Sequence, residues 1–142
     1  MIEPNMKDEN MTANIVFRLC SVALCFGLFG CERQISYSAD VQPILTESCL
    51  SCHNRAGEGS VTSGLSVSNY DDVLSGTSLG PVVIPGSSES SNLYRVIAMK
   101  TAPEIRMPPH HDVSLAEGRG VPLSDEQIEI IKKWIDQGAK DN

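Results

Sequence analysis

The sequence predicts one small domain with a helix at each end and long glycine- and proline-rich loops between them. Its 142 residues leave room for a single core. The clearest helix signal starts at Ser124, which forms a capping-box pattern with Gln127 and is followed by apolar residues at helical spacing. We expect Gly138 to end this helix, and its apolar face, with Trp134, to pack on the N-terminal helix.

The N-terminal helix is predicted just before the first motif of chemical interest. Ser38 is expected to be its N-cap, and Asp40 lies in the first turn, where a negative charge meets the positive end of the helix. Apolar residues at helical spacing then lead towards Cys49: Val41, Ile44 and Leu45.

The middle of the chain predicts loops with short helical turns. Residues 54–79 are rich in Gly and Ser, which favours tight turns. One or two helical turns are expected at 68–74, ended by Gly76, and a further helix over 93–99. The apolar run 82–84 is expected to be extended without a partner strand.

Charge and motif content exclude several classes of function. The formal net charge is −7, and the basic residues form no cluster. Nucleic acids and anionic membrane surfaces are bound by clustered Lys and Arg, so we expect no nucleic-acid partner. The sequence shows no carboxylate pair, Ser/His/Asp set or phosphate-binding glycine motif, so we do not expect an enzyme of those types.

The N-terminal segment is predicted to be an export signal. Residues 19–29 form an apolar run of signal-peptide length, too short to span a bilayer comfortably, and Arg18 precedes it. Acidic residues upstream suit a signal peptide badly, so Met11 is a candidate start beside Met1.

The apolar run ends in a Gly-Cys pair that resembles the lipid-attachment box of bacterial lipoproteins. We expect residues 1–30 to be a lipoprotein signal peptide, Cys31 to be lipidated, and residues 31–37 to tether the folded part, 38–142. Ordinary cleavage nearby and an uncleaved anchor helix are the alternatives. The expected location is the periplasmic side of a bacterial cell envelope, on a membrane reached through the lipid.

The central chemical motif is C-x-x-C-H, formed by Cys49, Cys52 and His53. This spacing is the attachment signature of c-type haem, because two thiols three positions apart can reach the two vinyl groups of one porphyrin edge. The adjoining histidine is then held under the iron as the proximal ligand. If the signal is removed, only Cys31 remains besides these two cysteines, so no disulfide framework is expected.

A second signal is Met107, which stands directly before two prolines. The prolines bias it away from helix and present its thioether from a stiff, extended loop. We predict Met107 to be the distal axial ligand of the iron. The alternatives are a methionine that fills a core gap, ligation by His110 or His111, and an open or water-bound iron.

The leading interpretation is a one-electron carrier with one covalently attached haem c, since iron with His and Met ligands has no open position for a substrate. Its partners would be periplasmic or membrane redox proteins. A second interpretation is a haem enzyme or small-ligand sensor, with His110 or His111 beside an open iron. A third is a structural zinc module that uses Cys49, Cys52 and the same histidine pair, which leaves His53 unexplained.

Several short motifs occur in a fixed order along the chain: Val41-Gln42-Pro43-Ile44-Leu45, Cys49-x-x-Cys52-His53, Gly64-Leu65, Pro85-Gly86, Ser91-x-Leu93-Tyr94, Met107-Pro108-Pro109, Leu123-Ser124 and Trp134-Ile135-Asp136-Gln137-Gly138-Ala139. Together they resemble the planctomycete-type branch of the cytochrome c domains. The resemblance implies a small all-α cytochrome c-like haem domain over residues 38–142, with its terminal helices packed together. It also implies attachment through Cys49 and Cys52, His53 as proximal ligand and Met107 as distal ligand.

Overall fold

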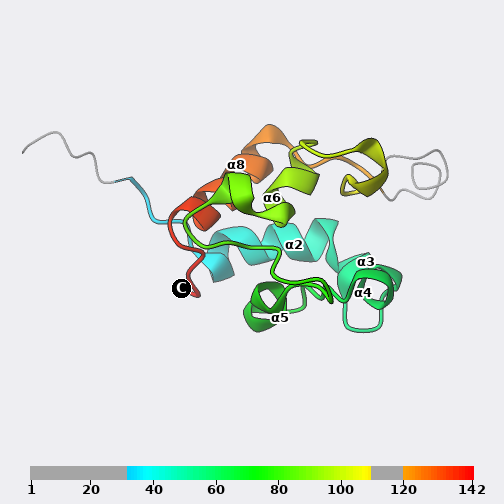
Figure 1. Cartoon of the computed structure of the whole chain (residues 1–142). Coiled ribbons are helices and arrows are strands. Elements are labelled where there is room, and N and C mark those ends of the chain that lie inside the picture. Colours follow the sequence, from blue (N-terminus) through cyan, green and yellow to red (C-terminus); the bar gives the residue numbers. More distant parts are fainter. Residues whose placement is uncertain (1–31, 110–119) are drawn as a thin grey trace, which may run out of the picture. The chain divides into compact units, whose positions relative to one another are not determined.

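The computed structural model describes residues 32–109 and 120–142 (Figure 1). The chain divides into two units after Arg33, and the second unit, 34–142, holds the elements described below. Within the described residues the regular structure is helical without a strand, and one isolated bridge joins Thr77 and Gly80. The predicted helical class is therefore confirmed for this part of the chain. None of its helices is long and apolar enough to cross a membrane.

Most of the described helices are short. In chain order they are η2 (Tyr37–Val41), α2 (Gln42–Ser48), α3 (Leu50–His53), α4 (Glu58–Ser63), α5 (Tyr70–Ser75), η3 (Ser88–Ser90), α6 (Asn92–Ile97), η4 (Pro103–Ile105) and α8 (Asp125–Asp136).

The N-terminal helix begins earlier than expected, because Ser36 and not Ser38 is its N-cap. The Ser36 hydroxyl accepts a hydrogen bond from the Ala39 amide at 3.2 Å, and the Asp40 carboxylate accepts one from the Ser36 amide at 2.8 Å. The Ser38 hydroxyl instead donates to the backbone carbonyl of Asn142 at 2.9 Å. The Ser36 hydroxyl donates to the same carbonyl at 2.5 Å, so both serines contact the distant end of the chain and only Ser36 also accepts from the first turn of the helix.

The C-terminal helix α8 has the predicted capping box. The Ser124 amide donates to the Gln127 side-chain oxygen at 2.9 Å, and the Gln127 amide donates back to the Ser124 hydroxyl at 3.2 Å. Gly138 lies just beyond the helix with a positive φ of 101°, which glycine adopts without strain. Both predicted ends of this helix are confirmed.

The terminal helical segments pack against each other, as expected. The rings of Tyr37 in η2 and Trp134 in α8 have their centroids 5.5 Å apart. The Ile35 amide donates to the Gln137 side-chain oxygen at 2.7 Å, and the Tyr37 amide donates to the Asn142 side-chain oxygen at 3.0 Å. Trp134 is buried at the centre of this contact, where it closes the core.

The predictions for the middle of the chain hold in part. Helix α5 ends before Gly76 as expected, and the run at 82–84 belongs to no helix or strand, with Val82 and Val83 buried. Helix α6 ends at Ile97 and not at Met99. The reason is the backbone of Met99, whose φ of 58° is outside the helical region.

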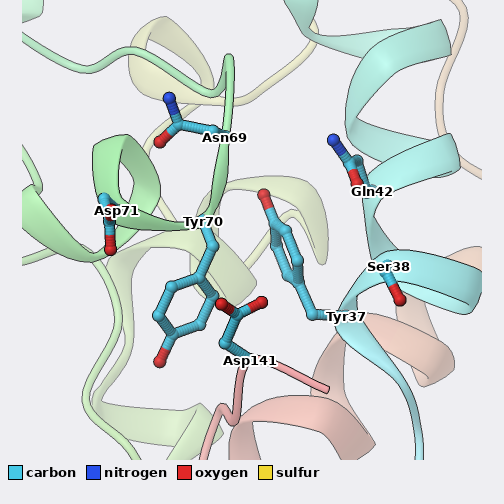
Figure 2. Close-up of a pocket in the computed structure, with 7 residues that line it drawn as sticks. All are labelled: Tyr37, Ser38, Gln42, Asn69, Tyr70, Asp71 and Asp141. Carbon is cyan, nitrogen blue, oxygen red and sulfur yellow. The ribbon is translucent and has the colours of Figure 1, made fainter.

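A pocket of about 260 Å³ lies beside η2 and the start of α5 (Figure 2). The Tyr37 hydroxyl points between Asn69 and Gln42, and it has no hydrogen-bond partner among the described residues. Burial, with a smaller contribution from nearby carboxylates, raises the pKa of Tyr37 to about 12. The Tyr70 hydroxyl points the other way and donates to the Ala139 carbonyl at 2.9 Å.

Candidate haem-attachment site

The turn between α2 and α3 brings the three residues of the C-x-x-C-H motif together. The Cys49 amide donates to the Leu45 carbonyl at 3.0 Å and extends the hydrogen bonding of α2. The His53 amide then donates to the Cys49 carbonyl at 2.9 Å, so Cys49, Cys52 and His53 share one helical turn. All three are half-buried.

The Cys49 thiol stays uncharged at neutral pH. Its burial, and secondarily the neighbouring Cys52, raise the pKa of Cys49 to about 11. The side chain packs against the hydrophobic core. A neutral sulfur at the edge of a core is compatible with an apolar ring bound beside it.

A hydrogen bond at His53 determines which ring nitrogen is available. The Nδ1 atom lies 3.2 Å from the Leu65 carbonyl oxygen. A carbonyl can only accept, so Nδ1 carries the proton and Nε2 keeps its lone pair. Nε2 has no hydrogen-bond partner in the described part of the chain. A metal-binding histidine typically has this arrangement, with its second nitrogen held by an outer partner.

The acceptor for His53 is held in place by helix α4. The Leu65 amide donates to the Ser63 hydroxyl at 3.1 Å, and the Ser60 hydroxyl donates to the Leu65 carbonyl at 2.5 Å. The Val67 amide donates to the His53 carbonyl at 2.8 Å. The histidine and the segment after α4 are therefore joined through both backbone and ring.

Two glycines allow α4 to approach the motif closely. A Cβ at Gly59 would lie 2.8 Å from both Cε1 and Nε2 of His53, and a Cβ at Gly57 would lie 2.2 Å from the Cys52 carbonyl oxygen. Both separations are shorter than real side chains tolerate. Glycine is thus required at these positions while the His53 imidazole and the Cys52 carbonyl keep their places.

The residues present fit a c-type haem. Two thiols and an imidazole with an available Nε2 lie in one turn, and glycines keep the neighbouring helix free of side chains there. Among residues 32–109 and 120–142, no group of three or more His, Cys, Asp or Glu is arranged to hold a metal ion by itself. Haem iron does not need such a group, because the porphyrin supplies four of its ligands.

Met107 lies on a different element from the motif. It is half-buried and packs against the core, and its amide donates to the Val96 carbonyl at 3.2 Å, which ties the loop after η4 to the end of α6. The peptide bond from Met107 to Pro108 is cis. In the view of Figure 1, η4 and the helices α3 and α4 lie towards the same end of the unit.

Three residues of the sequence predictions lie outside the described residues: Cys31, His110 and His111. The lipid anchor therefore stays a prediction. So do the alternatives that use the histidine pair, which are distal ligation, an open-iron site and the zinc module.

Sequence reasoning missed helix α4 and with it Gly59, Ser60 and the Leu65 carbonyl. The stretch was predicted to be a loop because of its Gly and Ser content. The signal that could have found the helix is its pair of flanking glycines, Gly57 at the N-cap and Gly64 at the C-cap with φ of 83°.

The comparison with known families gives a match over this site. Residues 49–111 match the family described as Planctomycete cytochrome C. The matched segment begins at the first cysteine of the motif and includes Met107. No curated protein and no solved structure gives a significant match.

Proposed function

We propose, from the match of residues 49–111 to the Planctomycete cytochrome C family, that the protein is an exported monohaem c-type cytochrome that transfers single electrons. The observation that carries the proposal is the hydrogen bond from His53 Nδ1 to the Leu65 carbonyl. It leaves Nε2 available in the same turn as the thiols of Cys49 and Cys52.

Each residue of the site has one role in this proposal. Cys49 and Cys52 hold one porphyrin edge through thioether bonds, and His53 binds the iron through Nε2. When bound, haem supplies an iron that cycles between the ferric and ferrous states. The chain contributes orientation, since α4 and the Leu65 carbonyl hold the imidazole in one rotation.

Met107 is proposed as the distal ligand. Support comes from the way its loop is held, with its amide bonded to Val96 and its side chain against the core. A soft thioether favours the ferrous state, which suits an electron carrier, and a second protein ligand leaves no position for a substrate.

Export and anchoring complete the proposal. Lipidation at Cys31 would place the cytochrome on the periplasmic side of a membrane in the bacterial envelope, where redox proteins of that compartment are its partners. Attachment of haem through C-x-x-C-H fits an exported chain. After removal of the predicted signal peptide, the proposal assigns Cys31 to the lipid and Cys49 and Cys52 to haem.

The decisive test is covalent attachment of haem through both thiols. We expect the wild type, produced together with haem-attachment machinery, to stain for haem on a denaturing gel, and the double variant Cys49→Ala/Cys52→Ala to show no stain. Ser51→Ala is the matched control, because Ser51 is exposed in the same turn and carries no thiol. Staining that persists in the double variant would falsify the proposal.

A further inference from the structure

Ser60 lies behind the proximal histidine and shares its hydrogen-bond acceptor. The residue is 9% exposed, on the inner face of α4. Its hydroxyl donates to the Leu65 carbonyl at 2.5 Å, while Nδ1 of His53 lies 3.2 Å from the same oxygen. One carbonyl therefore serves two donors, and the serine has the shorter contact.

The two donors compete for the Leu65 carbonyl oxygen, whose position the backbone fixes. A carbonyl oxygen has two lone pairs, and each hydrogen bond that it accepts withdraws electron density from the other. Leu65 cannot swing towards one donor easily, because its amide is bonded to the Ser63 hydroxyl at 3.1 Å. Ser60 thus weakens the bond that the carbonyl makes to His53.

We propose that Ser60 is a positioning residue that raises the reduction potential of the iron by weakening the hydrogen bond of the proximal histidine. The inference rests on the proposed function, in which Nε2 of His53 binds the iron. A strong bond at Nδ1 gives an imidazole more imidazolate character, so it donates more charge and favours ferric iron. The serine limits this donation and shifts the balance towards the ferrous state.

The test is the reduction potential of the purified holoprotein, measured by spectroelectrochemistry. Ser60→Ala frees the carbonyl for His53, so we expect the potential to fall. A threefold loss in the equilibrium constant for reduction corresponds to about 28 mV at 59 mV per tenfold for one electron. Ser60→Thr keeps the hydroxyl, so this variant should have the potential of the wild type.

One further readout and two sets of control variants separate this role from simple packing. The proton NMR signal of the His53 ring N–H should shift in Ser60→Ala, because its hydrogen bond becomes stronger. Ser75→Ala is the control: its hydroxyl makes a comparable 2.7 Å bond to the Asp71 carbonyl within α5, and we expect no change in potential. If the alanine variant accumulates poorly, Thr and Val at position 60 have nearly the same shape and differ in the hydroxyl, so Val alone should lower the potential.

The outcomes are distinguishable. A haem-loaded Ser60→Ala or Ser60→Val protein whose potential equals or exceeds that of the wild type overturns the inference and leaves the proposed function intact. A wild-type protein that takes up no covalent haem overturns the proposed function itself, and this inference with it.

Discussion

Among single residues, His53 shows how one hydrogen bond selects a chemistry. The motif alone places an imidazole after two thiols, but either ring nitrogen could then face a metal. The Leu65 carbonyl, 3.2 Å from Nδ1, assigns the proton to that nitrogen and leaves Nε2 with the lone pair that the proposed iron ligand needs. Gly59 contributes by the absence of a side chain, which lets α4 lie against the ring edge.

A second prediction for a single residue concerns Met107 as the proposed distal ligand. We expect Met107→Ala to remove the long-wavelength charge-transfer band of a thioether bonded to ferric haem, to lower the reduction potential and to open the iron to cyanide. The reason is the loss of the soft sulfur that favours ferrous iron. Visible spectra and a redox titration measure all three effects.

Met99→Ala is the matched control for this variant. Met99 is also half-buried but lies in the turn after α6, so its removal should leave the band in place. Loss of the band in His110→Ala or His111→Ala, with Met107→Ala unchanged, would mean that a histidine is the distal ligand. A wild-type iron that is already open would favour the enzyme or sensor alternative.

Among the elements, η2, α5 and α8 meet through three aromatic rings. The centroids of Tyr37 and Tyr70 are 5.2 Å apart, and those of Tyr70 and Trp134 are 6.5 Å apart, both in edge-to-face geometry. Such pairs stabilise the fold beyond the contribution of the area that they bury. The two tyrosine hydroxyls differ, because only Tyr70 has a partner, the Ala139 carbonyl.

This difference predicts opposite effects of the same substitution. Tyr70→Phe should lower the free energy of unfolding by about 1 kcal/mol, since it leaves the Ala139 carbonyl without its donor. Tyr37→Phe should raise it by about 1 kcal/mol, since it removes a buried hydroxyl that has no partner among the described residues. Urea unfolding of the haem-loaded proteins gives both values. Equal destabilisation by the two variants would show that the Tyr37 hydroxyl is bonded in solution.

At the level of the whole molecule, attachment to a membrane is predicted to depend on the segment before the domain. The anchor proposed here is the lipid at Cys31, which follows the apolar run of residues 19–29. This arrangement would separate anchoring from electron transfer, since the proposed haem site lies within residues 34–142.

Cys31→Ser should therefore move the protein from the membrane fraction to the soluble periplasmic fraction. The haem spectrum should stay unchanged, because the substitution lies outside the haem site. Fractionation followed by haem staining measures the distribution. Cys25→Ser is the control, since that cysteine belongs to the predicted signal peptide and its variant should remain on the membrane. A Cys31→Ser protein that stays in the membrane would identify the apolar segment as an uncleaved anchor.

The sequence alone predicted the arrangement of residues that lie close together along the chain. The C-x-x-C-H motif needs only five consecutive residues to bring two thiols and an imidazole into one turn, and the capping box needs only Ser124 and Gln127, three positions apart. Residues this close have little freedom to separate once a helical turn forms, so their spacing predicts their geometry.

Tertiary structure decided the partners that lie farther along the chain. The hydroxyls of Ser36 and Ser38 both donate to the Asn142 carbonyl, at the distant end of the chain. The His53 ring meets the Leu65 carbonyl, which follows helix α4 in a Gly- and Ser-rich stretch. A backbone carbonyl carries no side-chain signature, so no pattern of residue types could mark Leu65 as the acceptor. Which distant group meets a side chain depends on how the elements pack, and that is set by the shape and burial of the whole core.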